Sequence, residues 1–484
     1  MVIRAFFEYL AGYSGPWDLE YFNGSCAMGS ALLIAGFWES RQEGDIMNKK
    51  LNHDLLGETS EIECLRLITD GSGIGYQNGI ATFVPGLLPG ETGEIVVYEA
   101  KKKWQRAHLQ SVTKRSPLRL DPPCTVYEQC GGCQLQHTTY EETLLWKQRW
   151  VSDALTRIGK INVEVKPTIG MEQPWRYRNK VRLHRKSDGQ LGYYKEKSQA
   201  LVDFQDCLLL SKPMNRWIRL TREFLADSYP EIHTLTFREN KKNEGLLLLE
   251  GTPTKMLSAE ENPEFFETLS EQGLRSVWGT DEEGSLVLIW GDEEFNQTIL
   301  DMTFEISPLS FLQVNSQQTD ILYKLVLSSA ALTGEEIVWD LYSGIGTLAL
   351  ALASKAKKVT GIEENPYAVE NAIKNAVDNH AVGHVEFLKG KVEQRIMKIE
   401  EHPDVVVLDP PRAGLHPEVV QRLLELKPQR IIYVSCDPGT LARDLGVLTQ
   451  GGYRVDSVQP VDMFPWTMHV ECIIMMTNSG LKGK

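Results

Sequence analysis

The chain has 484 residues, a formal net charge of −14, and 42% hydrophobic and 24% charged residues. This length exceeds one core of ordinary size, so we expect two or three domains that each bury their own apolar surface. No uninterrupted apolar run reaches the roughly 20 residues of a membrane-spanning helix, which predicts a cytoplasmic protein without membrane segments. The acidic balance argues against nonspecific polyanion binding by the whole surface, so any such binding depends on local patches.

Two stretches carry an excess of positive charge. Residues 101–120 hold seven Lys or Arg and no acidic residue, and residues 176–186 hold six Lys or Arg. Most such runs are solvated charged faces. In the second stretch Trp175 and Tyr177 lie beside the cations, and RNA contact needs cations and aromatic rings together, so this patch favours RNA binding.

The first 46 residues show no pattern typical of a fold. The apolar stretch 26–38 lies downstream of Asp18 and Glu20, which is unlike the core of a signal peptide. Because a polar segment follows Met47 directly, we expect translation to begin there. Residues 1–46 are then a disordered extension or a wrongly assigned start.

Between residues 58 and 115, short apolar strands alternate with glycine turns, which predicts a small antiparallel β-barrel. The runs ITDGSGIGY at 68–76 and FVPGLLPGE at 83–91 resemble a TRAM domain, an RNA-binding barrel of OB-like type. The expected strands are 62–68, 79–83, 85–89 and 93–98.

Residues 120–310 are expected to form a central domain of mixed α+β type that carries four of the eight cysteines. Apolar periodicity predicts helices over 215–228 and 263–272, and alternation predicts strands at 235–237, 246–249 and 286–290.

Residues 311–484 alternate strands and helices, as expected of a parallel, doubly wound α/β sheet. The last two strands are joined by a short loop with no helical span, so they should form an antiparallel hairpin. Seven strands with the last one reversed is the Rossmann-like arrangement of methyltransferases. The seven expected strands are 337–341, 358–363, 385–388, 405–408, 431–435, 454–461 and 470–476.

The first of these strands runs into a glycine-rich turn, Tyr342-Ser343-Gly344-Ile345-Gly346-Thr347. Gly344 and Gly346 would let a ligand approach the backbone closely, but they also satisfy the dinucleotide fingerprint, with Glu363 where a ribose-binding acid belongs. This motif alone leaves a nicotinamide enzyme and a methyltransferase equally open.

Two further features favour the methyltransferase. Asp340 completes the D-x-x-x-G-x-G signature that S-adenosylmethionine sites share, and a dinucleotide site does not require it. Asp409-Pro410-Pro411-Arg412 ends the fourth strand, where methyltransferases place polar groups beside the reacting methyl. The alternative for this segment is a turn that ends the strand.

Cys436 follows the last apolar residue of the fifth strand and precedes Asp-Pro. A lone cysteine is usually a small core residue, but this thiol should face the ligand crevice at the carboxyl edge of the sheet. Glu471 opens the reversed seventh strand, so it begins at the same edge. We therefore expect Cys436 and Glu471 to meet.

Four runs of residues resemble the RNA uracil-5-methyltransferase family: FLQVN at 311–315, DPPRAGL at 409–415, SCDPGTLARDL at 435–445 and FPWTMHVEC at 464–472. The resemblance extends from about residue 58 to the C-terminus. It implies transfer of a methyl group from S-adenosylmethionine to C5 of uracil, with Cys436 as nucleophile and Glu471 as base. Relatives that act on cytosine carry a cysteine in the fourth-strand motif, where this chain has Arg412.

The resemblance also implies the residues that hold the cofactor. Glu363 would bind the ribose hydroxyls, and the signature adds Asp340 and Gly344 to the set. The others implied are Gln313, Tyr342 and Asp409.

Cys124, Cys130, Cys133 and Cys207 supply four thiolates, enough for zinc or for a 4Fe-4S cluster. Gly131-Gly132 favours a metal-binding turn over unrelated cysteines, but the spacing does not separate the two metals. The resemblance implies a 4Fe-4S cluster, because family members that modify 23S ribosomal RNA carry one on this spacing. It therefore implies ribosomal RNA as the partner of a monomeric enzyme. The alternatives are transfer RNA, an iron–sulfur RNA-binding protein without catalysis, or a nicotinamide oxidoreductase.

Overall fold

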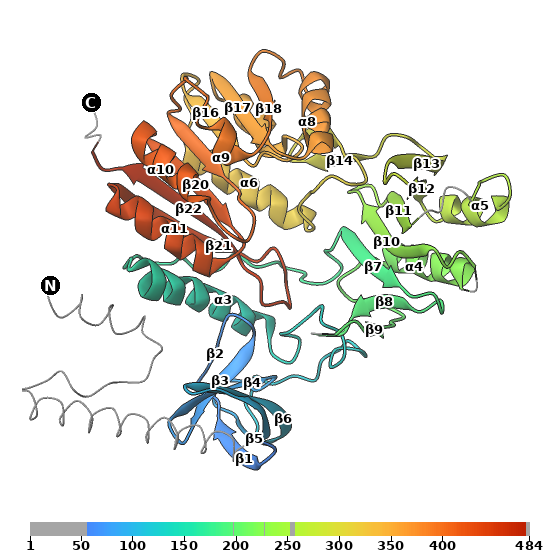
Figure 1. Ribbon diagram of the computed structural model, residues 1–484, viewed down its shortest axis with the longest axis vertical. Helices are drawn as coiled ribbons and strands as arrows, with labels where there is room; N and C mark the ends of the chain where they lie inside the picture. Colours follow the sequence, from blue (N-terminus) through green and yellow to red (C-terminus); the bar gives the residue numbers. More distant parts are fainter. Residues whose placement is uncertain (1–55, 197, 227, 252–256, 481–484) are drawn as a thin grey trace, which may run out of the picture.

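The computed structural model describes residues 56–196, 198–226, 228–251 and 257–480, so the expectation for residues 1–46 lies outside the described residues. In chain order the described part holds a six-stranded sheet, a seven-stranded sheet, a two-stranded hairpin and a second seven-stranded sheet (Figure 1). No helix among these residues is long and apolar enough to cross a membrane.

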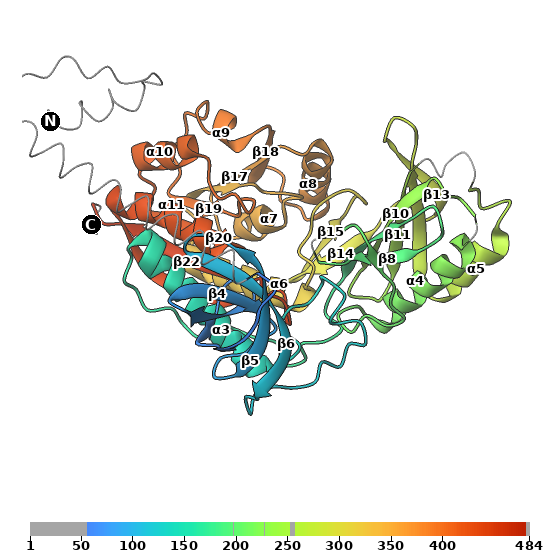
Figure 2. The same cartoon turned by 60° about the horizontal axis from the view of Figure 1, so that its bottom comes forward.

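The first sheet is curled (Figure 2). Its strand order is β1-β5-β6-β4-β3-β2. Its core is formed by alternate apolar residues such as Ile62, Val84 and Ile95. The expectation of a wholly antiparallel barrel is wrong in one pair, because β4 and β6 run parallel. The strands are β1 (Thr59–Glu63), β2 (Arg66–Leu67), β3 (Ser72–Gln77), β4 (Ile80–Pro85), β5 (Thr92–Ala100) and β6 (Trp104–Lys114).

Helix α3 (Tyr140–Ala154) lies between this sheet and the C-terminal sheet (Figure 1). The Thr139 side chain caps its N-terminus by accepting a hydrogen bond from the backbone N–H of Glu142. On one side Trp146 and Trp150 pack against the first sheet, and on the other Val151 joins the core of the C-terminal sheet. The sequence pattern did not predict this helix.

The central sheet has the order β13-β12-β11-β10-β7-β8-β9. Helices α4 (Lys212–Leu225) and α5 (Pro263–Glu271) cover one face and bury Trp217 and Phe266 against it. The two helices and three strands predicted for this region are all present, with boundaries shifted by a few residues. The strands are β7 (Lys180–Arg185), β8 (Leu191–Tyr194), β9 (Leu201–Val202), β10 (Ile232–Glu239), β11 (Gly245–Gly251), β12 (Leu274–Thr280) and β13 (Leu286–Gly291), followed by the hairpin β14 (Asn296–Ile299) and β15 (Met302–Glu305).

The C-terminal sheet has the order β18-β17-β16-β19-β20-β22-β21, with β22 antiparallel to both neighbours. The predicted α/β arrangement with a reversed last strand is confirmed. Helices on both faces complete two apolar layers. Its strands are β16 (Ile337–Leu341), β17 (Lys358–Glu363), β18 (Val385–Lys389), β19 (Val405–Leu408), β20 (Arg430–Ser435), β21 (Tyr453–Val461) and β22 (Glu471–Asn478), and its helices are α6 (Ser316–Ala330), α7 (Thr347–Ala353), α8 (Pro366–Asp378), α9 (Val392–Arg395), α10 (Pro417–Leu426) and α11 (Pro438–Gln450).

Candidate active site

The carboxyl ends of β16, β17, β19 and β20 open onto a cavity of about 960 Å³. This volume suits an organic ligand of cofactor size, and the edge of the sheet is where open α/β folds bind such ligands. Asp340 is buried and does not line the cavity, whereas the other predicted site residues of this domain do: Gln313, Tyr342, Gly344, Glu363, Asp409, Cys436 and Glu471.

The turn after β16 brings backbone N–H groups to the cavity. Gly344 and Gly346 have φ angles of 56° and 80°, in the left-handed region that favours glycine. The backbone N–H of Gly344 donates to Glu363 Oε2 at 3.0 Å, and that of Asn365 donates to Glu363 Oε1 at 2.8 Å. The Glu363 carboxylate is thereby held in one orientation, with further lone pairs available for hydroxyl groups of a ligand.

Two buried carboxyl groups lie at the ends of β16 and β19. Burial, then repulsion from Asp409, raises the pKa of Asp340 to about 8, and Oδ2 of Asp340 has no hydrogen-bond partner. Burial raises the pKa of Asp409 to about 7, against the effect of a hydrogen bond from Gln313. A cationic ligand would relieve this repulsion, so the donor set fits the positively charged sulfonium cofactor.

Cys436 and Glu471 come together at the same edge, as predicted. Their neighbours Ser435 and Cys472 are register partners in β20 and β22. Burial and then the Glu471 carboxyl raise the pKa of the Cys436 thiol to about 11. Burial and then Asp409 raise the pKa of Glu471 well above its usual value, and Arg412 opposes both increases.

Several cavity residues were not predicted. Glu364 and Asn365 follow Glu363, and Asn365 caps helix α8 with its side chain, a role that the sequence Asn-Pro indicates. Glu393 contributes to raising the pKa of Tyr342. It lies in no recognisable sequence motif, so the sequence did not identify it. Phe464 belongs to the loop before β22. It lies in the run FPWTMHVEC, which resembles the family, but nothing in that run indicated that Phe464 in particular would line the cavity.

The four predicted metal ligands Cys124, Cys130, Cys133 and Cys207 line one small cavity of about 40 Å³. Burial raises the pKa of Cys133 to about 12 and also raises those of Cys130 and Cys207. Within the described ranges, however, no group of three or more His, Cys, Asp or Glu side chains is arranged to hold a metal ion. The structure thus brings the four thiols to one place but shows no metal site there.

The aromatic and basic patch at 175–186 is largely occupied within the protein. Arg176 pairs with Asp206, and Arg185 donates to backbone carbonyls at the end of α4 and in the following turn, including that of Ser228. Tyr177 is buried, and the Trp175 ring is stacked on Trp466. These four side chains therefore stabilise the fold, and RNA contact by the patch stays a prediction.

Comparison with known proteins agrees with the site. Residues 292–479 match the family model described as tRNA (Uracil-5-)-methyltransferase. An uncharacterized RNA methyltransferase of Clostridium tetani is 37% identical over 86% of this chain and 95% of its own, and one from Halalkalibacterium halodurans is 38% identical over 86% and 96%. The structure of Pyrococcus abyssi tRNA (uracil-54, C5)-methyltransferase with S-adenosyl-L-homocysteine superposes with a TM-score of 0.66, at 29% identity over 87% of this chain and 100% of that one.

The fold and the cavity define an S-adenosylmethionine-dependent methyltransferase that acts on RNA. More narrowly, the chain belongs to the RNA uracil-5-methyltransferase family.

Proposed function

We propose that this enzyme methylates C5 of a uridine through a covalent intermediate with Cys436. The observation that carries the proposal is the convergence of Cys436 and Glu471 on one cavity from two different strands. Tyr342, Gly344 and Glu363, which line the same cavity, are among the residues that would hold the cofactor.

The proposed chemistry accounts for both side chains. C5 of uracil is a poor nucleophile, so Cys436 first loses its thiol proton to solvent and adds to C6 as the thiolate. The C5–C6 π pair then becomes a C4–C5 double bond, and the carbonyl π pair moves onto O4 as an enolate. The cofactor supplies a methyl group on a positively charged sulfur. After C5 has taken up the methyl, Glu471 removes the C5 proton, the C5–C6 double bond re-forms, and the Cys436 thiolate leaves.

RNA that carries 5-fluorouridine tests the nucleophile, because fluorine at C5 cannot leave as a proton. The wild-type protein should form an adduct that survives denaturation and has the mass of protein plus methylated RNA. Cys436→Ala should form none, while still binding S-adenosylhomocysteine, because the thiol is placed to contact the base. An adduct with Cys436→Ala, or none with an active wild type, would contradict the assignment.

We further propose 23S ribosomal RNA as the substrate and the first sheet as a TRAM domain within residues 58–115. The family pattern of a barrel plus four cysteines supports this choice. Transfer RNA is the second candidate, favoured by the Pyrococcus abyssi structure, which covers 87% of this chain. Mass spectrometry of both RNA pools from a deletion strain separates them: loss of 5-methyluridine from ribosomal RNA alone is expected, and loss from transfer RNA alone refutes it.

For the central domain, within residues 120–310, we propose that Cys124, Cys130, Cys133 and Cys207 hold a 4Fe-4S cluster. The support is the soft thiolate donor set around one cavity with an apolar wall, formed in part by Val126, Tyr193 and Phe204. We also propose that the enzyme is a cytoplasmic monomer.

A further inference from the structure

A loop of nine residues, 462–470, joins β21 to β22 and leads directly into Glu471. Val461 and Glu471 are register partners across the two strands. The first residue of the loop, Asp462, therefore lies close to its last residue, Val470. Glu471 is thus held on one side by strand pairing and on the other by this loop. We call residues 462–470 the base loop.

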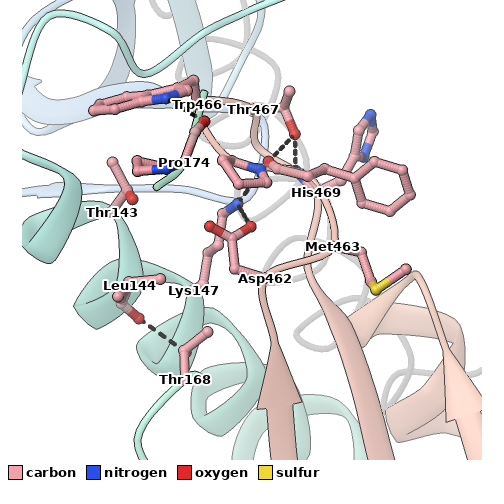
Figure 3. A network of polar contacts seen from close by, with 12 residues as sticks. Thr143, Leu144, Lys147, Thr168, Pro174, Asp462, Met463, Trp466, Thr467 and His469 are labelled. Atoms are coloured by element: carbon pink, nitrogen blue, oxygen red, sulfur yellow. Dashed lines mark hydrogen bonds and ion pairs between the residues drawn. The ribbon is translucent and has the colours of Figure 1, made fainter. Parts of the chain in front are cut away.

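A buried ion pair fixes the start of the base loop (Figure 3). Lys147 of α3 donates through Nζ to Asp462 Oδ1 at 2.5 Å, and neither side chain is exposed to solvent. The same ammonium donates to the carbonyl oxygen of Phe464 at 3.0 Å, and the Tyr140 hydroxyl donates to Asp462 Oδ2 at 2.8 Å. The Tyr140 oxygen in turn accepts the backbone N–H of Met171 at 3.0 Å.

Stability alone does not explain this ion pair. Burial of two charges carries a desolvation penalty that often equals or exceeds their attraction, and packed apolar residues of the same volume are frequently as stable. Burial lowers the pKa of Lys147, which is the signature of that penalty. Unlike apolar residues, the ammonium group of Lys147 makes directed contacts to two points of the base loop, Asp462 and Phe464.

Trp466 fixes the middle of the base loop to the segment that carries the cysteines. Its carbonyl oxygen accepts the backbone N–H groups of Gln134 and Leu135, each at 3.0 Å, immediately after Cys133. Its indole N–H donates to the carbonyl of Pro174 at 3.0 Å (Figure 3). Trp466 has a φ angle of 66°, a conformation that a bulky residue keeps only where its surroundings hold it.

The far end of the base loop contacts Arg412, which lines the cavity. The His469 ring lies 3.3 Å from Arg412, measured between Nε2 and Nη2. Arg412 is the cation that opposes the rise in pKa of both Cys436 and Glu471. Displacement of the loop would therefore move Glu471 and disturb the charge beside it.

We propose that Lys147 is a positioning residue for Glu471, which acts through its ion pair with Asp462 to hold the base loop in the one conformation that permits proton removal. This inference rests on the proposed function of Glu471. It assigns a role in the chemistry to α3, a helix outside the C-terminal sheet.

The test compares two reactions of the same variants. Adduct formation with 5-fluorouridine RNA requires Cys436 and the cofactor but not removal of the C5 proton. Turnover of uridine RNA requires Cys436, the cofactor and removal of the C5 proton. Lys147→Met and Asp462→Asn should bind S-adenosylhomocysteine and form the fluorinated adduct at close to the wild-type rate. Their turnover should fall by about 10-fold to 10²-fold, the scale for a base misplaced by about 1 Å, and methylated adduct with natural RNA should accumulate.

Lys241→Met is the matched control, because Lys241 forms a partly exposed ion pair with Asp320 at 2.7 Å, outside the base loop. It should leave both reactions unchanged. Should Lys147→Met fail to fold, Tyr140→Phe decides the question, since it removes one hydrogen bond to Asp462 and keeps the ion pair. It should slow turnover by a smaller factor, again with adduct accumulation.

Equal losses in the two reactions, or full turnover without accumulated adduct in the folded variants, would overturn the positioning role and leave a purely structural ion pair. Failure of the proposed function has a different signature: the wild-type protein itself would then form no adduct with 5-fluorouridine RNA.

Discussion

Alanine at either of two glycines in the turn after β16 should have different effects: a large loss of stability at Gly346, and mainly a loss of cofactor binding at Gly344. A Cβ on Gly346 would lie 2.6 Å from the Phe387 ring and 3.2 Å from Ala372 Cβ, whereas a Cβ on Gly344 would meet no atom within 4 Å. Both residues have positive φ, which costs an alanine about 1–2 kcal/mol. The clash with Phe387 adds about 1–3 kcal/mol at Gly346 only.

Gly346→Ala should therefore lower the free energy of unfolding by about 2–5 kcal/mol, and Gly344→Ala by about 1–2 kcal/mol. Because Gly344 lines the cavity, its added methyl should instead weaken S-adenosylhomocysteine binding by about 10-fold or more, or at least about 1.4 kcal/mol. Urea unfolding without ligand and calorimetric titration measure the two effects. Equal loss of stability in both variants, or wild-type affinity in Gly344→Ala, would refute the reasoning.

Three further predictions address the proposed base, a buried carboxyl group and the four clustered cysteines. Glu471→Gln should still form the adduct but release product about 10²-fold more slowly, so trapped methylated RNA is expected on denaturing gels, and normal turnover would exclude Glu471 as the base. The folded-state pKa of Asp340, about 8, exceeds its unfolded value, so the stability that Asp340 contributes is fully present below about pH 4 and is lost as pH rises through 8. Between these two pH values the melting temperature of the ligand-free protein should fall less steeply in Asp340→Asn than in the wild type. Equal slopes of melting temperature against pH in the two proteins would contradict the raised pKa. Anaerobically purified protein should be brown and contain four irons, Cys133→Ser should lose the colour and unfold more readily, and one zinc without iron would refute the cluster.

The C-terminal sheet was predictable because its parallel strands are buried on both faces and appear as continuous apolar runs. The strand predicted at 337–341 agrees with β16, and that at 405–408 agrees with β19. The reversed last strand followed from the short loop before it, and this placed Glu471 beside Cys436. Strand order and a few motifs were therefore enough to predict most of the site residues that line the cavity.

Two elements that the sequence did not predict, β6 and α3, have charged residues within a strand or buried in a helix. β6 contains Arg106, His108 and Lys114, and its alternation of small and polar residues gives no clear apolar face. α3 buries Lys147, a residue type that is almost never fully buried without a partner. That partner, Asp462, lies 315 positions away, so no local pattern could identify the pair.

The same contrast explains why residues outside the C-terminal sheet matter to its chemistry. Cys436 stands between β20 and α11, where sheet pairing and the Asp437 cap of the helix fix the backbone. Glu471 is the first residue of β22 and pairs with Val461, and the nine-residue loop between these two residues is held by contacts from other parts of the chain. In the proposed mechanism the covalent bond to RNA must be broken in every turnover, so the proposed base needs a position as well defined as that of the proposed nucleophile. Contacts from Lys147, and from the backbone beside Cys133, supply that definition from parts of the chain that the cavity itself does not include.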